Sequence, residues 1–210
     1  MISSGIRRSI PIVPLVLLLA QVSHADNVVV PGERVGAVKL GATLAQVRAL
    51  LGSPTKTTKW KSGETQDSFM GTKPPVDEYG SEKYPRRNLV VIYRAGKVVQ
   101  IEFNSPAFRT SKGISLKSSL QDFRRAYGSP KAQALAMLDE GGGGYVAYYY
   151  DSVANGIAFS FGTQDYFDAT ITPVELRIHK RGAKVLPDPG GKPQKAGEEV
   201  PIGTINKGAG

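Results

Sequence analysis

One pattern of 17 residues occurs twice in this chain, 76 positions apart. The first copy, residues 38–54, reads VKLGATLAQVRALLGSP, and the second, residues 114–130, reads ISLKSSLQDFRRAYGSP. Two leucines, one arginine and the final Gly-Ser-Pro recur at the same places. A repeat constrains a fold strongly, because each copy must form the same kind of supersecondary unit. We therefore predict two related units in tandem.

Each copy has the pattern of a short capped helix. Thr43 and Ser119 are candidate N-caps, because a hydroxyl accepts a hydrogen bond from a free N–H of the first turn. Gly52 and Gly128 suit the left-handed position that ends a helix, and the proline two residues later prevents continuation. Apolar residues at i, i+3 and i+7 place one stripe on each helix. They are Leu44, Val47 and Leu51 in the first copy and Leu120, Phe123 and Tyr127 in the second.

Strand patterns follow both helices, and helices this short need a sheet to pack on. The strands predicted after the first helix are Thr55–Trp60, Asn88–Arg94 and Lys97–Phe103, and Ala95-Gly96 forms a hairpin turn between the last two. The strands predicted after the second helix are Lys131–Leu138, Tyr145–Asp151, Gly156–Gly162 and Val174–His179. Along residues 97–103, Val99, Ile101 and Phe103 share one face. Val98, Gln100 and Glu102 share the other. We predict one apolar face and one mixed, partly open face.

These patterns predict an α+β fold of two tandem helix-plus-antiparallel-sheet units, with the helices packed on one face of a continuous curved sheet. The units cover residues 26–106 and 107–182. Residues 61–87, rich in charges and turn formers, are predicted to be a long loop. The glycine run 141–144 is a predicted hairpin tip. Residues 183–210, rich in Gly, Pro and Lys, are predicted to be a disordered tail.

The first 25 residues are predicted to be a cleaved export signal. Two arginines at 7–8 precede an apolar run over residues 10–20, and small residues stand at −3 and −1 of a cleavage site after Ala25. The run is short for a hydrocarbon core of about 30 Å and contains two prolines, which disfavours a membrane anchor. We expect a periplasmic or secreted protein. The paired arginines leave open whether export uses the Sec or the twin-arginine route.

The composition narrows the function further. Cysteine is absent, which excludes disulfides, thiolate zinc sites, cysteine nucleophiles and lipid anchoring at cysteine. The formal net charge is +9, and loss of the two arginines at 7–8 leaves +7. A basic exported protein could favour anionic envelope polymers or lipid headgroups, or the charge could serve solubility alone. Nucleic acid is not an expected partner, because no recognisable nucleic-acid-binding module occurs.

The repeated helix pattern ending in Gly-x-Pro, followed by strands, resembles the unit of the β-lactamase-inhibitor-protein family and is similar to that of BamE-type envelope lipoproteins. The resemblance covers about residues 32–180. It implies one helix or a short helical pair on three or four antiparallel strands, with two tandem units forming a curved sheet whose open face grips a partner. The inhibitor proteins carry disulfides and BamE is anchored through cysteine, so neither specific activity carries over. Whether a β-lactamase is the target stays open.

Catalytic residues are few. Beyond the predicted signal the sole histidine is His179, and a hydrolase triad would need Ser160 and Glu175 beside it. The sequence has no nucleophile elbow, no paired-histidine zinc helix and no phosphate loop. Asp151, Asp165 and Asp168 lack the spacing of a calcium loop. We therefore expect no cofactor, no metal and no enzymatic activity, with a small hydrolase as a remote alternative.

The candidate partner-binding residues are aromatic and polar side chains of the expected open face and the loop. Tyrosine and arginine on an exposed sheet are favoured interface anchors, and cross-strand packing is their other interpretation. Tyr148 and Tyr150 are predicted core residues. The candidates are Gln100, Tyr145, Tyr149, Ser160, Arg177 and His179 on the sheet, and Trp60, Tyr79 and Tyr84 in or beside the loop. The predicted function is an exported module that binds another envelope or extracellular protein; the alternative partner is an anionic envelope polymer or lipid headgroup.

Overall fold

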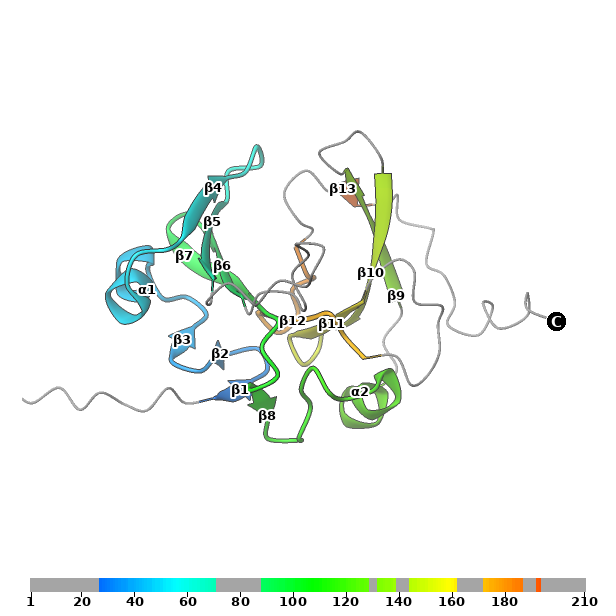
Figure 1. Cartoon of the computed structure of the whole chain (residues 1–210). Helices are drawn as coiled ribbons and strands as arrows, with labels where there is room; N and C mark the ends of the chain where they lie inside the picture. The colour runs from blue at the N-terminus through cyan, green and yellow to red at the C-terminus, as the bar shows by residue number, and fades with distance from the viewer. Residues whose placement is uncertain are drawn as a thin grey trace, which may run out of the picture.

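The computed structural model describes residues 27–70, 88–128, 132–138, 144–161, 172–186 and 192–193 (Figure 1). The elements up to the first long hairpin are β1 (Val28–Val30), β2 (Arg34–Val35), β3 (Val38–Lys39), α1 (Leu44–Leu51), β4 (Lys56–Lys59), β5 (Thr65–Met70), β6 (Asn88–Arg94) and β7 (Lys97–Phe103). The later elements are β8 (Arg109–Thr110), α2 (Leu120–Tyr127), β9 (Ala132–Leu138), β10 (Gly144–Ser152), β11 (Ile157–Phe161), β12 (Glu175–His179) and β13 (Lys192–Pro193).

The predicted fold class is wrong. Instead of two tandem helix-plus-sheet units of an α+β protein, the described residues are mainly strand, with a four-stranded sheet, a nine-stranded sheet and two helices of eight residues each. The pattern analysis missed β1, β2, β3 and β8, because strands of two or three residues are too short to show an alternation. It also placed β5 inside the predicted loop 61–87.

The local helix signals are confirmed. The Thr43 hydroxyl accepts a hydrogen bond from the Gln46 N–H at 3.2 Å, and the Gln46 side chain accepts one from the Thr43 N–H at 2.8 Å. Ser119 and Asp122 form the same reciprocal box at the start of α2. The helices end at Gly52 and Gly128, with φ of 83° and 85°. The local sequence therefore sets where each helix starts and stops.

The nine-stranded sheet has the order β13-β9-β10-β11-β12-β7-β6-β5-β4, and its neighbouring strands are antiparallel. Strand β12 joins the two ends by pairing with β7 on one side and β11 on the other. In Figure 1 the sheet bends between its ends, with α1 and α2 outside the bend and residues 180–186, which follow β12, inside it. The small sheet, order β3-β2-β1-β8, contains one parallel pair, β1 with β8.

The main core covers one face of the large sheet, here called the core face. Two rows of paired residues cross it, one through Phe103, Leu176, Phe159 and Tyr150 and the other through Val91, Ile101, Ile178 and Ile157. From α2, the Phe123 ring lies edge-on to Phe159, with centroids 5.4 Å apart. A register shift between Ile92 and Tyr93 pairs Tyr93 with Val98, so Val98 joins the core while the predicted Val99 stays half-buried.

The opposite face, here called the inner face, is not open as predicted. Seven of its side chains are at most 5% exposed; they are Gln100, Glu102, Tyr149, Asp151, Ser160, Arg177 and His179. Residues 183–186, predicted to begin a disordered tail, bring the buried Val185 onto this face. Further on, β13 pairs with β9.

Several predictions lie outside the described residues. They are the export signal 1–25, loop residues 71–87, most of the glycine tip, Asp165 and Asp168, and the tail apart from residues 183–186 and 192–193. Neither of the described helices, at eight residues, has the length or apolar character to cross a membrane.

Candidate functional site

The inner face carries a polar row that runs across the middle of the large sheet. Glu102 on β7 pairs with Arg177 on β12, Arg177 pairs with Ala158 on β11, and Ala158 pairs with Asp151 on β10. Because directly paired residues point to the same side of a sheet, this register gathers charged groups from distant parts of the sequence. The predicted residues Gln100, Ser160 and His179 share the face.

Arg177 is the centre of this row. Its Nε donates to a Glu175 carboxylate oxygen at 2.6 Å, and its Nη1 lies 3.3 Å from a Glu102 carboxylate oxygen. The guanidinium also lies over the Tyr149 ring, 4.4 Å from the centroid. The side chain is 3% exposed, so it is a buried cation matched by two carboxylates and an aromatic face.

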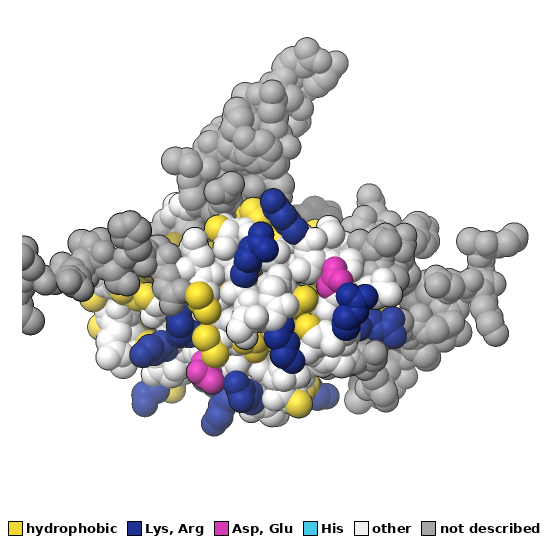
Figure 2. All heavy atoms as spheres, turned by 90° about the horizontal axis from the view of Figure 1, so that it is seen from below, with side chains coloured by type: hydrophobic (Ala, Val, Ile, Leu, Met, Phe, Trp, Pro, Cys, Tyr) yellow, Lys and Arg dark blue, Asp and Glu magenta, His cyan; other side chains and the backbone are white. Residues whose placement is uncertain are grey.

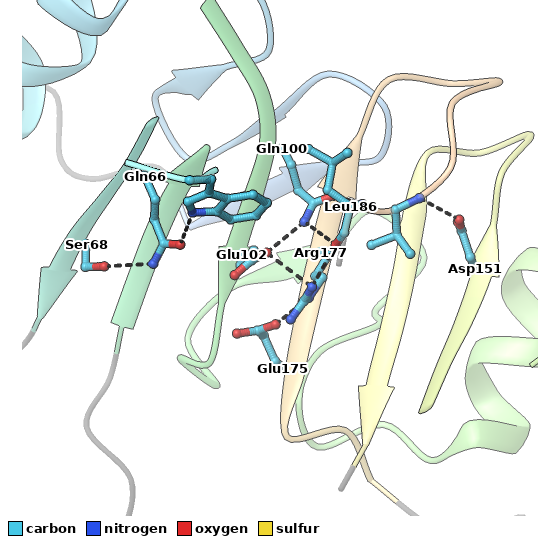
Figure 3. Close-up of polar contacts among 10 residues, drawn as sticks. Gln66, Ser68, Gln100, Glu102, Asp151, Glu175, Arg177 and Leu186 are labelled. Carbon is cyan, nitrogen blue, oxygen red and sulfur yellow. Dashed lines mark hydrogen bonds and ion pairs between the residues drawn. The ribbon is translucent and has the colours of Figure 1, made fainter. Parts of the chain in front are cut away.

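The inner face holds the main chain of residues 185–186 (Figure 3). Gln100 accepts a hydrogen bond from the Leu186 N–H at 2.7 Å and donates one to the Leu186 carbonyl at 3.3 Å, while Arg177 donates to that carbonyl at 3.0 Å. Asp151 accepts a hydrogen bond from the Val185 N–H at 2.9 Å. Three sheet side chains therefore bind backbone groups of one short segment that follows β12.

His179 does not form the hydrolase arrangement. Its Nε2 lies 2.8 Å from Asp151 Oδ1, and its Nδ1 lies 3.1 Å from the Lys180 carbonyl. Ser160 is instead paired with Glu175, four residues from His179 along β12, which is about 13 Å at strand spacing. Both ring nitrogens are thus engaged by groups other than Ser160 and Glu175.

Of the partner-binding residues predicted in or beside the loop, the structure describes Trp60 only. Trp60 is half-buried, and its indole N–H donates to the Gln66 side chain at 3.1 Å, which in turn donates to Ser68. Tyr79 and Tyr84 lie outside the described residues, and the side chain of Tyr145 is not described.

Of the nine predicted partner-binding residues, the structure brings together Gln100, Tyr149, Ser160, Arg177 and His179, and it buries all five.

A pocket of about 700 Å³ lies where three separate parts of the chain meet: residues 32–41, the turn between β6 and β7, and residues 179–186. Leu40, Val98, Val99 and Leu186 supply apolar lining. Arg94, Lys97, Lys180 and Lys184 also line it, and these four cations are exposed. We call this site the basic pocket. Sequence analysis missed it, because no local pattern links these three segments.

Charges are separated between the interior and the surface. Of the seven acidic side chains that the structure describes, Glu64, Asp67, Glu102 and Asp151 are buried, Asp122 and Glu175 are half-buried, and Glu33 is exposed. Among the described lysines and arginines, Arg177 alone is buried. Figure 2 shows one face on which Lys and Arg side chains are widely spread and acidic ones are few. The described surface is therefore strongly basic.

Another buried carboxylate, that of Asp67 on β5, is bound by a side chain of α1. Arg48 donates to both Asp67 oxygens at 2.8 Å, and Thr57 donates to one of them at 2.6 Å. Burial alone would raise the pKa of Asp67, but the hydrogen bonds from Arg48 and Thr57 outweigh it and hold this pKa below its ordinary value. Burial, together with the Asp67 charge, raises the pKa of the neighbouring Tyr93.

Comparison with known proteins gives little guidance. No protein-family model matches the sequence, and no curated protein matches it either. Among solved structures, the chain is similar to a cysteine-rich secretory protein from Staphylococcus aureus, with 8% identity and a TM-score of 0.43. The match covers 72% of this chain but only 46% of that one. A similarity this weak supports no conclusion about fold or function, and the resemblance to the inhibitor and BamE families stays a prediction.

Proposed function

We propose that this protein is a non-enzymatic binding protein of the cell envelope or extracellular space, and that its partner is an anionic surface or polymer. The observation that carries the proposal is the separation of charges in the described part of the chain, where six of the seven acidic side chains are buried or half-buried and every lysine or arginine of described burial except Arg177 is exposed or half-buried. Such a surface attracts polyanions, because on the described part of the chain the exposed lysines and arginines outnumber the exposed acidic side chains. The proposed location rests on the predicted export signal.

Vesicle and polymer binding test this proposal. Purified protein is mixed with phosphatidylcholine vesicles, with vesicles containing phosphatidylglycerol, and with soluble polyphosphate. We expect binding to an anionic probe but not to phosphatidylcholine alone. Raising the salt from about 0.1 M to about 1 M shortens the screening length from about 10 Å to about 3 Å and should abolish binding. Binding whose affinity does not change with salt concentration, or no binding to either anionic probe, would contradict the proposal.

A charge-reversal pair sharpens the test. Lys39 on β3 and Lys117 before α2 are both exposed. The double variant K39E/K117E should bind the anionic probe more weakly, whereas the matched control K39R/K117R keeps both charges and should bind as the parent does. Equal loss of probe binding in both variants would indicate a specific contact made by one of these lysines rather than attraction by the overall positive charge of the surface.

A protein partner is the second candidate, and the contacts to residues 185–186 favour it. Main-chain groups of any extended segment could make the bonds that Gln100, Asp151 and Arg177 make here. This mode requires residues 185–186 to leave the inner face. Hydrogen exchange measures that directly: Val185 and Leu186 amides must exchange faster than the Ile101 and Ile178 amides of the core. Exchange of all four at the rate of global unfolding would rule this mode out.

A further inference from the structure

We propose that the basic pocket binds a single-chain anionic amphiphile, that is, one hydrocarbon chain ending in a carboxylate or a phosphate. This inference rests on the proposed function, because it names a class of anionic ligand and a defined place for it. The argument uses the rigidity of the pocket, its lining and its charges.

The pocket is preformed, because hydrogen bonds fix its walls. The Gly41 N–H donates to the Val98 carbonyl at 2.8 Å, and the Val98 N–H donates to the Ala42 carbonyl at 2.9 Å, which joins the first wall to the β6–β7 turn. Gln100 holds Leu186 in the third wall through both main-chain groups. A ligand therefore need not order these segments when it binds.

The lining suits a hydrocarbon better than a peptide. A bound peptide needs main-chain partners, but the N–H groups of Gly41, Val98 and Leu186 are already bonded within the protein. His179, the buried polar side chain of the lining, has both ring nitrogens engaged. Apolar surface from Leu40, Val99 and Leu186 remains, within a volume typical of small-molecule sites.

The charges at the pocket select an anionic end group. Arg94 is already bound to Glu64 at 2.6 Å. Lys97, Lys180 and Lys184 are exposed, and none of the three pairs with a carboxylate among the residues that the structure describes. Lysine side chains place an ammonium on a flexible stem, so three of them can converge on one carboxylate or phosphate.

Calorimetric titration with soluble amphiphiles, each below its micelle concentration, tests the ligand class. Octanoate, decanoate and dodecanoate vary the chain, decyl phosphate varies the anion, and decanol and decyltrimethylammonium lack an anion. We expect affinity to rise about fourfold per added CH₂ until the pocket is filled. Decanol should bind about tenfold more weakly than the better of decanoate and decyl phosphate, and that better ligand identifies the headgroup. Equal binding of decanol and both anions would overturn the proposal.

Variants test whether the amphiphile binds in the basic pocket. Ala183 lines the pocket and is exposed, so A183W should fill the space and abolish decanoate and decyl phosphate binding. The control A49W adds the same ring on the exposed side of α1 and should bind normally. K97E/K184E should weaken binding, whereas K56E/K59E on β4 should not. Circular dichroism melting establishes that each variant is folded; a folded A183W that binds like the parent would exclude this pocket.

Vesicle binding separates the two proposals. A183W keeps the basic surface, so it should still bind phosphatidylglycerol vesicles or polyphosphate at low salt. Anionic vesicle or polymer binding by the parent without any amphiphile binding would overturn the pocket alone. Loss of both would overturn the proposed function as well.

Discussion

The ion pairs of this protein differ sharply in what the removal of one partner should cost in stability. Arg177 faces Glu102, Glu175 and the Tyr149 ring with almost no exposure, whereas Arg125 and Asp122 meet at 3.3 Å with side chains that are 71% and 45% exposed. Removing one partner of a buried pair leaves an uncompensated charge in a low dielectric, while water replaces an exposed partner at little cost.

We expect R177A to lower the free energy of unfolding by about 3–5 kcal/mol. The matched control R125A should change it by less than about 1 kcal/mol. Urea unfolding followed by circular dichroism measures both. A cost for R177A as small as that for R125A would show that Glu102 and Glu175 find other partners.

Asp67 makes stability depend on pH. Its pKa is lower in the folded protein than in the unfolded chain, so its contribution is fully present above the unfolded-state pKa of about 3.9 and is lost as pH falls through the folded-state value. We expect D67N to be less stable than the parent at pH 7, with the difference shrinking below about pH 4. Urea unfolding across this range measures it; a constant difference would contradict the assignment.

At the scale of elements, the helices and the β6–β7 hairpin could be predicted from sequence, because their signals are local. Capping hydroxyls, an apolar stripe and a terminal glycine mark both helices, and β6 and β7 have the predicted bounds. Strand β5 could not be predicted, because its sequence TQDSFM buries Asp67 and Ser68 rather than alternating. Asp67 is satisfied by Arg48, a residue 19 positions away.

The caps give a prediction at this scale. S119A removes the oxygen that accepts the Asp122 N–H and should cost about 1 kcal/mol of stability. S119D keeps an acceptor at the same position and should retain most of that stability. Thermal unfolding of the two variants compares them directly, and equal melting temperatures would show that α2 does not depend on its cap.

For the whole molecule, the sequence placed Gln100, Tyr149, Ser160, Arg177 and His179 on one face, and the structure agrees. Their predicted exposure was wrong, because the residues that cover them follow β12 in a stretch whose composition is typical of disorder. The basic pocket was equally hidden, since its walls come from segments up to about 150 positions apart. Local patterns reveal which residues share a face, but not what lies over it.

The cover over the inner face can be tested by one substitution. V185D places a carboxylate against Tyr149 and Ala158, next to Asp151, so residues 185–186 should detach. We expect faster hydrogen exchange at the Val185 and Leu186 amides, with the core-face amides still protected. The control A183D adds the same charge at an exposed position and should leave exchange at Leu186 unchanged. Unchanged exchange in V185D would show that its main-chain bonds suffice.

The position of β12 has a consequence for how the chain folds. This strand stands in the middle of the large sheet, yet its partner β7 precedes it by about 70 residues. Closing a loop of that length comes late and slows folding, because the entropy is lost before the contacts form. We expect the chain to stay incompletely folded until the whole of β12, up to His179, has emerged from the ribosome.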